Sequence, residues 1–340
     1  MKINKQRLNP FQLKIRTLLK PLQKLIRHGD YPWQGVLIGV SALVMIIVLA
    51  VGVMLWRESS NARTALGIEF LLPTSNPSWN PITDEFHAWP FIYGTLMTSI
   101  VAIIIALPIS LGIAIFMAEL CPEWLKLPID WLVELLAAIP SVVYGLWGIF
   151  VFLPKVVSPV AMFLYTSFSH LPALGVLFAG PPPANGATRL GAAMVLTIMI
   201  IPTITAVTRD VLLAIPDNQR EASLALGSTK WESIWKVLLP YGISGILGAV
   251  ILGLGRALGE TMAVTMVIGN SIEGSVSLLR PGYTMASIIA NEFAEAVSMM
   301  HSEVLIGMGM VLFFITLFLN IIARFLVWQV ARRTPQEARV

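Results

Sequence analysis

Six long apolar runs constrain this chain of 340 residues more than any other feature of its sequence. A run of about 18 or more mostly apolar residues is long enough to cross the hydrocarbon core of a bilayer as a helix. Only 12% of the residues are charged, which is roughly half the share found in soluble domains. The sequence therefore predicts an all-α polytopic membrane protein with six transmembrane helices, at 34–56, 91–118, 129–153, 190–214, 241–269 and 304–328.

A seventh apolar run, 158–180, does not fit this pattern. It is interrupted by Pro159, His170, Pro172 and Gly175, and prolines remove hydrogen bonds from a helix interior. We expect a loop or a re-entrant hairpin outside the membrane core.

The Lys and Arg residues predict the orientation. Six spans place both termini on one side of the membrane, and 17 of the 23 Lys and Arg fall on that side. Because cytoplasmic loops carry the excess of positive charge, this side is predicted to be the cytoplasm. The net charge of +4 is then a matter of topology and does not indicate nucleic-acid binding. The expected segments are a cytoplasmic arm at 1–33, a periplasmic segment at 57–90, a core at 91–328 and a cytoplasmic tail at 329–340.

The arm at 1–33 has two interpretations. Apolar residues at helical spacing among eight basic ones fit a helix lying on the anionic inner leaflet, although Pro21 would break or kink it. A disordered basic tail that only sets the orientation explains the same composition. The apolar run after the arm is too long for the core of a signal peptide, so we expect it to be retained as a span.

The cytoplasmic loop 215–240 is built as helix, glycine hinge and helix. Good helix formers run from Asn218 to Leu226 and stop at Gly227, a residue that readily adopts positive φ. Ser228 or Thr229 can then cap a second helix, with a glutamate in its first turn. The loop carries too many apolar residues for a solvated connector and too much charge for a membrane span. We infer that another protein covers it.

Several kinds of chemistry are not indicated. The single cysteine, Cys121, allows no intrachain disulfide, and the four histidines have no metal-ligand spacing. The 340 residues contain no G-x-x-x-x-G-K-[ST] phosphate loop, so ATP hydrolysis is not expected of this chain, and no cofactor is expected in it. Any energy that this chain needs for its function would then come from another subunit or from an ion gradient.

The loop also carries a known motif. Glu221-Ala222, then Gly227, then Leu239-Pro240 resemble the EAA loop of ABC importer permeases, with Ser223 in place of the second alanine and Val237 in place of an isoleucine. The resemblance implies the type I (MetI-like) permease fold and a coupling helix that inserts into a groove of an ATPase subunit. The residues implied in coupling are Arg220, Glu221, Ala222, Gly227 and Pro240. Packing of the loop on its own bundle is the structural alternative.

Three further segments narrow the family. Residues 134–145, 253–263 and 290–296 are similar to those of the permease subunits of phosphate-specific ABC importers, and the similarity runs from about 91 to 328. It implies phosphate transport in the bacterial cytoplasmic (inner) membrane. The implied partners are a homologous permease, two copies of an ATPase that binds ATP and Mg²⁺, and a periplasmic phosphate-binding protein.

Arg256 and Glu260 are four residues apart in the fifth predicted span, so we expect them to pair on one helix face. An ionisable pair at membrane depth by default faces a pathway or the bundle interior. In one interpretation Arg256 offers its donors to a phosphate oxyanion and Glu260 neutralises it when the pathway is empty. In the other, the two residues form a buried pair that fixes helix register.

Four more residues are candidates for a gate or for structure. Pro140 removes a hydrogen bond from the third predicted span and can kink it, and Glu134 lies near the cytoplasmic end of that span. Glu292 and Glu295 are three residues apart before the sixth span. Carboxylates do not bind phosphate, so their expected use is to dock a partner or to repel substrate; a solvated loop helix is the alternative.

Two other functions remain open from sequence. An ion-coupled secondary transporter would use Arg256 and Glu260 as its coupling pair, but it would leave the 220–240 segment without a purpose. An ABC permease for another oxyanion, sulfate or molybdate, would keep the same class of transporter and change only the anion, which the specificity of the binding protein largely decides.

Overall fold

The computed structural model describes residues 30–73, 77–172, 174–272 and 274–333. The chain divides into two compact units, Met1–Arg57 and Glu58–Val340. Most of the predicted basic arm and the last residues of the predicted tail lie outside the described residues.

Helix α2, Asp30–Glu58, contains the described part of the first unit, residues 30–57. Its residues are apolar on every face, and nearly all of its described side chains are exposed. A helix of this kind is suited to lipid or to burial against another protein. This matches the first predicted span, at 34–56.

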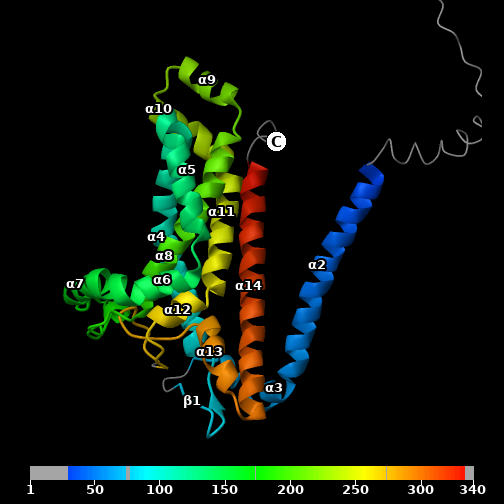
Figure 1. The fold of residues 1–340 in the computed structure, drawn as a ribbon, viewed down its shortest axis with the longest axis vertical. Coiled ribbons are helices and arrows are strands. Elements are labelled where there is room, and N and C mark those ends of the chain that lie inside the picture. Colours follow the sequence, from blue (N-terminus) through cyan, green and yellow to red (C-terminus); the bar gives the residue numbers. More distant parts are fainter. Residues whose placement is uncertain (1–29, 74–76, 173, 273, 334–340) are drawn as a thin grey trace, which may run out of the picture. The chain divides into compact units, whose positions relative to one another are not determined.

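The second unit is built around three helices that pack on one another, α4 (Trp89–Ile115), α8 (Arg189–Leu213) and α11 (Leu239–Gly259) (Figure 1). Small residues of α4 and α11, such as Ala102 and Ala249, are fully buried in the core that they share with α8. At Gly253 of α11 an added Cβ would lie 2.7 Å from the Ile204 side chain of α8. Small residues at these positions let the helix axes approach closely, as in other membrane bundles.

Two ends of this unit can be distinguished in Figure 1. At the α9 end lie α5 (Glu123–Ala138), α9 (Asp217–Ala225), α10 (Lys230–Ser233) and two π-helical segments, η2 (Phe116–Leu120) and η5 (Ile234–Leu238). At the hairpin end lie α3 (Ser60–Leu66), η1 (Glu69–Leu71), β1 (Trp79–Asn80), β2 (Glu85–Phe86), α13 (Met285–Glu292) and η6 (Phe293–Glu295). The helix α14, Met299–Arg333, begins at the hairpin end and packs against α11.

A separate apolar cluster holds the hairpin end together. Trp79 of β1 and Phe86 of β2 are buried with residues of α3, α4, α13 and α14. The short antiparallel pair, in which Trp79 faces Phe86, is the only strand pairing among the described residues and is a small addition to an otherwise helical chain. Glu303 of α14 accepts hydrogen bonds from Asn61 Nδ2, at 2.8 Å, and from the Ala62 amide, at 3.2 Å, which fastens α3 to α14.

The third apolar run is divided differently from the prediction of one span at 129–153. Helix α5 ends at Ala138, and the backbone is extended at Ile139 and Pro140 before α6 (Ser141–Trp147) begins. Proline lacks an N–H and disfavours helical geometry in the preceding residue, which explains a break here and not merely a kink.

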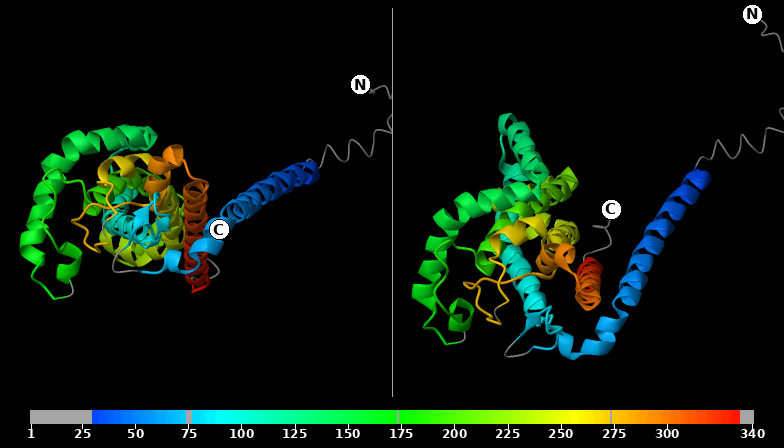
Figure 2. Two further views of the ribbon diagram at one scale, coloured as in Figure 1. Left: turned by 90° about the horizontal axis from the view of Figure 1, so that it is seen from below. Right: turned by 60° about the horizontal axis from the view of Figure 1, so that its bottom comes forward.

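The helix continues past the predicted end of that span. The π-helical segment η3 (Gly148–Val157) and α7 (Ser158–Phe168) extend α6 into a curved arm beside the bundle (Figure 2). The expected loop or hairpin at 158–180 is therefore helical in its first half and contains the short 3-10 helix η4 (Leu174–Phe178) in its second. Pro159 lies in the first turn of α7, where a missing N–H costs little.

Within the described residues, six helices are long and apolar enough to cross a membrane, so the predicted number is confirmed. The third of them is Ser141–Phe168, and the fifth begins at Lys230. The remaining helix, α12 (Met262–Val267), follows α11 after a short break.

Candidate functional site

The segment from α9 to α10 has the predicted form of helix, glycine hinge and helix. Gly227 has φ +85°, the left-handed conformation that glycine adopts without strain. Thr229 caps α10 by accepting a hydrogen bond from the Glu232 amide, and the Glu232 carboxylate accepts one from the Thr229 amide. This reciprocal capping box fixes the start of the second helix. The predicted positive φ at Gly227, a cap at one of the two proposed residues (Thr229) and the glutamate in the first turn are confirmed.

Two serines close the turn around Gly227, and their contact with each other was not predicted from the sequence. The Ser228 amide donates to the Ser223 carbonyl and the Gly227 amide to the Leu224 carbonyl, which is the Schellman pattern of a helix end. The Ser228 hydroxyl also donates to the Ser223 carbonyl, at 2.6 Å, and lies 2.8 Å from the Ser223 hydroxyl. This pair stands where such motifs commonly have an apolar contact. Ser223, which departs from the second alanine of the EAA pattern, is buried and has a structural use here.

The outer face of this segment is exposed and mixed in character. Glu221 and Ala222 of the motif are exposed. Leu226 is 90% exposed, and Trp231 and Trp235 are about half exposed, with their rings in edge contact at 5.7 Å between centroids. We name Glu221, Ala222, Leu224, Leu226, Trp231 and Trp235 the coupling surface, after the role that the resemblance to the EAA loop implies for this segment. Large apolar side chains gathered beside charges in this way are typical of a surface that another protein covers.

Arg220 differs from its motif neighbours because its guanidinium turns into the chain. Its Nη2 lies 2.8 Å from Glu119 Oε1 of η2, and its Nη1 and Nη2 donate to the carbonyls of Ile215 and Leu212, at the end of α8. The predicted role of Arg220 in direct coupling therefore has a second interpretation, in which the side chain anchors α9. Glu119 was not singled out from the sequence, because an acid at the end of an apolar run has no obvious partner until the fold is known.

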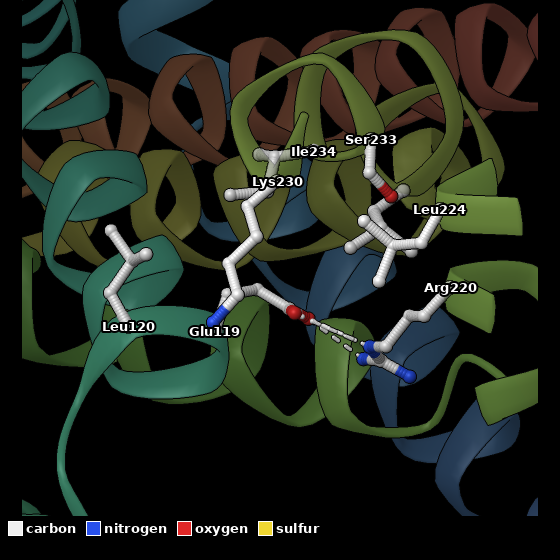
Figure 3. A pocket seen from close by; sticks show the side chains of 8 residues that line it. Glu119, Leu120, Arg220, Leu224, Lys230, Ser233 and Ile234 are labelled. Atoms are coloured by element: carbon white, nitrogen blue, oxygen red, sulfur yellow. Dashed lines mark hydrogen bonds and ion pairs between the residues drawn. The ribbon is translucent and has the colours of Figure 1, made fainter. Parts of the chain in front are cut away.

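A cavity of about 180 Å³ lies between η2, α9, α10 and η5 (Figure 3). Leu120, Leu224, Ile234 and Leu238 form its apolar wall, and the Glu119–Arg220 pair lies at its edge. Pro240 is exposed in the first turn of α11, directly after π-helical η5. A proline at this point is compatible with the locally widened helix.

Arg256 is half-buried on α11, and its Nη1 donates to the Thr203 hydroxyl of α8 at 3.0 Å. Thr203 was not identified from the sequence, since one threonine in an apolar span carries no signal. Of the three glycines near Arg256, only Gly253 is packed closely against α8. An added Cβ at Gly255 or Gly259 would meet no atom within 4 Å.

The expected pairing of Glu260 with Arg256 on one helix face is wrong. Helix α11 ends at Gly259, and the backbone at Glu260 is extended, with ψ 123°. The Glu260 carboxylate instead accepts a hydrogen bond from the Ala263 amide, at 3.2 Å, in the first turn of α12. Carboxylates commonly satisfy the free amides of a helix start in this way. Glu260 therefore caps α12 at the break that follows Arg256.

The remaining candidates lie apart from these residues. Glu134 is exposed on α5, and Pro140 is exposed at the break between α5 and α6. Glu292 turns inward at the hairpin end, where its Oε2 accepts from Trp79 Nε1 at 2.7 Å and lies 2.9 Å from His301 Nε2. Glu295 is exposed on η6. The two carboxylates thus do not act as one pair, because only Glu295 faces outward.

No group of three or more His, Cys, Asp or Glu side chains that could hold a metal ion occurs in the part of the chain that the structure describes. The polar clusters at both ends are built from ion pairs and hydrogen bonds between protein groups.

Comparison with known families identifies the fold of this site. Residues 110–335 match the family described as binding-protein-dependent transport system inner membrane component. The chain belongs to this family. It is a membrane component of a transport system, and its α9–α10 segment lies within the region that matches.

Relatives in this family are similar over nearly their whole length. A phosphate transport system permease protein PstC from Xylella fastidiosa is 44% identical over 306 residues, which cover 90% of this chain and 93% of the relative. A protein of the same name from Mesorhizobium japonicum is 45% identical over 292 residues, which cover 86% and 88%. A probable one from Methanocaldococcus jannaschii is 36% identical over 306 residues, covering 88% and 94%.

Solved structures agree with the type I (MetI-like) permease fold. A chain of the inward-facing MetNI methionine ABC transporter superposes with a TM-score of 0.51 at 17% identity, covering 74% of this chain and 99% of that one. A chain of a bacterial ABC transporter that imports alginate gives 0.58 at 13% identity, covering 93% and 100%. The predicted fold is confirmed by these two superpositions.

Proposed function

We propose that this chain is the membrane permease subunit of an ATP-driven importer that moves inorganic phosphate across the bacterial cytoplasmic membrane. The observation that carries the proposal is the 44% identity, over 90% of the chain, with a relative named as a phosphate transport permease. Membership of the binding-protein-dependent family supports the same conclusion.

The coupling surface faces the cytoplasm in this proposal, on the side of both termini. Leu226, Trp231 and Trp235 supply exposed apolar area, and removal of such area from water favours association with a partner. The occupant is an ATPase subunit, which binds and hydrolyses ATP with Mg²⁺. The rigid turn around Gly227 presents the two short helices in a fixed relation to it.

A complete importer needs more than this chain. It carries one coupling surface, so it engages one ATPase, and a homologous permease engages a second copy. The two permeases enclose the pathway between them. A periplasmic phosphate-binding protein delivers the anion on the opposite side of the membrane.

Arg256 is the residue proposed to meet phosphate in the pathway. A guanidinium has five N–H donors in a planar fork that suits an oxyanion, and the one hydrogen bond of Arg256 among the described residues uses Nη1. Thr203 holds that nitrogen and leaves the others to face the anion. Glu260 acts by capping α12, which fixes the chain break next to Arg256.

The ion-coupled secondary transporter is less well supported. It required Arg256 and Glu260 to form a coupling pair, and the two side chains bond to different partners. It also leaves the exposed aromatic residues of the coupling surface without a use.

Reconstitution in vesicles tests the proposal. The chain is co-expressed with a homologous permease and an ATPase subunit of a phosphate importer, and uptake of radiolabelled phosphate is measured with ATP inside the vesicles and loaded binding protein outside. We expect uptake that requires ATP and that excess sulfate or molybdate does not compete away. Uptake by the chain alone, driven by an ion gradient, would contradict the proposal, and preferential uptake of sulfate or molybdate would change its substrate.

A further inference from the structure

Helix α9 makes its polar contacts with the rest of the bundle through Arg220, near its start. Among helices and π-helical segments, α9 packs mainly on α10 and η5, the other parts of the same loop. Arg220 reaches beyond them to Glu119 of η2, to the Leu212 carbonyl in the last turn of α8 and to the Ile215 carbonyl just after that helix. The Arg220 and Glu119 side chains are 19% and 14% exposed, so this contact is largely shielded from water.

The geometry of this contact is that of a rigid joint. Nε and Nη2 of Arg220 both donate to Glu119 Oε1, at 3.0 and 2.8 Å, while Nη1 donates to the Ile215 carbonyl at 2.6 Å. Nη2 also donates to the Leu212 carbonyl at 2.7 Å. A planar guanidinium can hold three segments in one orientation, which a lysine ammonium on a flexible stem cannot. Asp217 adds a carboxylate at 3.2 Å but is 89% exposed.

Glu119 connects this contact to the long helix α4. It lies in η2, which continues α4 without a break from the start of that helix at Trp89. Helix α4 alone has 27 residues, or about 40 Å at 1.5 Å per residue, and its other end packs in the hairpin-end cluster through Phe91. A displacement of Glu119 is therefore passed to both ends of the second unit.

A cavity beside the Arg220–Glu119 pair leaves this pair as the main direct contact between α9 and η2. Leu120 and Leu224 face each other across a space of about 180 Å³, so apolar packing does not fix α9 to η2 there (Figure 3). The tight contact between the two elements is the ion pair at the edge of the cavity.

We propose that the Arg220–Glu119 pair is the joint that transmits movement of the coupling surface to α4, and thus to the opposite end of the pathway. The proposal rests on the proposed function, because it needs an ATPase to move α9. Both side chains act as positioning residues, and neither is required to contact the ATPase or phosphate.

The test compares Glu119→Gln with Glu123→Gln in the reconstituted complex. The two glutamates are four residues apart, and each variant removes one carboxylate charge. Unlike Glu119, Glu123 has a side chain that is 88% exposed, and its carboxylate lies 2.6 Å from Lys126 Nζ. That ordinary surface hydrogen bond, which raises the pKa of Lys126, joins no separate elements. ATPase retention, ATP hydrolysis and phosphate uptake are measured on the same vesicles.

For Glu119→Gln we expect the ATPase to be retained and its basal hydrolysis to stay within about twofold of wild type, while phosphate moved per ATP falls about tenfold, a typical coupling between two sites. Glu123→Gln should match wild type in every readout. If Glu119→Gln moved as much phosphate per ATP as wild type, the proposed role of the Arg220–Glu119 pair would be wrong.

Two further arms complete the design. If Glu119→Gln does not accumulate in the membrane, Glu119→Asp is tested in its place, because it keeps the charge and withdraws the carboxylate by one methylene. We expect Glu119→Asp to move less phosphate per ATP hydrolysed than wild type. An unchanged amount of phosphate per ATP would contradict the proposal. If the wild-type chain retains no ATPase, the proposed function fails instead, and that result does not depend on any Glu119 variant.

Discussion

The hydroxyls of Ser223 and Ser228 lie 2.8 Å apart across Gly227, and only one of the two also reaches a backbone carbonyl. Ser228 donates to the Ser223 carbonyl, so the Ser223 hydroxyl is the donor in the contact between them. Ser228 thus takes part in two hydrogen bonds of its side chain, and Ser223 in one. The turn that presents the coupling surface is closed by these contacts.

Removal of the two hydroxyls should have unequal effects. We expect Ser223→Ala to lower the free energy of unfolding of the loop by about 1 kcal/mol or less, and Ser228→Ala by roughly 1 to 2 kcal/mol, because a hydrogen bond contributes about 1 kcal/mol net. A double-mutant cycle, followed by hydrogen exchange of the Gly227 and Ser228 amides, measures the difference. Equal effects of the two single changes would contradict the assignment of donors.

Gly227→Ala should disturb coupling and leave assembly intact. An added Cβ meets no atom within 4 Å, so the cost comes from φ +85° alone, which is about 1 to 2 kcal/mol for an L-residue. We expect normal amounts of chain in the membrane, continued ATP hydrolysis and a severalfold loss of phosphate uptake.

Gly67→Ala is the matched control for that change. Gly67 also has positive φ, +57°, and open space around its Cβ position, but it ends α3 at the hairpin end. Its ψ of −149° lies in a region almost restricted to glycine, so the strain of an alanine there should be at least as large as at Gly227. Backbone strain alone should therefore appear in both variants and uncoupling only in Gly227→Ala. Coupled transport that survives in Gly227→Ala would remove the support for a coupling role of this turn.

The contacts of some residues could be predicted from the sequence and those of others could not. The difference depends on how far apart in sequence the interacting residues are. Gly227 and the Thr229 cap depend on neighbours within a few residues, so local rules predicted them correctly. The break at Pro140 is also local, but the span was drawn through it because apolar length was given more weight than proline geometry.

Partners far apart in sequence were not predictable. Arg220 and Glu119 are separated by 101 positions and Arg256 and Thr203 by 53, and no local pattern joins them. For Glu260, helical spacing suggested a partner that the end of α11 makes inaccessible.

Glu292 and Glu295 should respond differently to the same substitution. Glu292 accepts from Trp79 and contacts His301, so Glu292→Gln weakens a hydrogen bond to a largely buried carboxylate, which is expected to cost about 1.5 to 3 kcal/mol. Glu295→Gln, on the exposed 3-10 turn, should change stability by less than about 0.5 kcal/mol. Thermal unfolding of the purified protein in detergent gives both values. Equal stability of the two variants would show that the Glu292 contacts do not hold the hairpin end together.

Changes at Arg256, Thr203 and Glu260 separate anion contact from chain geometry. Arg256→Gln removes the charge that would meet phosphate, and we expect uptake to fall at least about tenfold while the ATPase is retained, because a charge-assisted hydrogen bond contributes roughly 1.5 to 3 kcal/mol. Thr203→Val keeps the charge and removes the 3.0 Å hydrogen bond, so its effect should be a smaller loss, seen mainly as a higher phosphate concentration for half-maximal uptake.

Glu260→Gln completes this series, because the amide keeps an oxygen that can accept from Ala263 and loses the charge. If Glu260 acts by capping α12, uptake should remain within about twofold of wild type, whereas Glu260→Leu, which has no acceptor, should lower stability by about 1 kcal/mol and reduce uptake. A strong loss in Glu260→Gln would instead indicate that its charge is needed beside Arg256. Normal uptake in both Arg256→Gln and Glu260→Gln would remove these residues from the phosphate pathway.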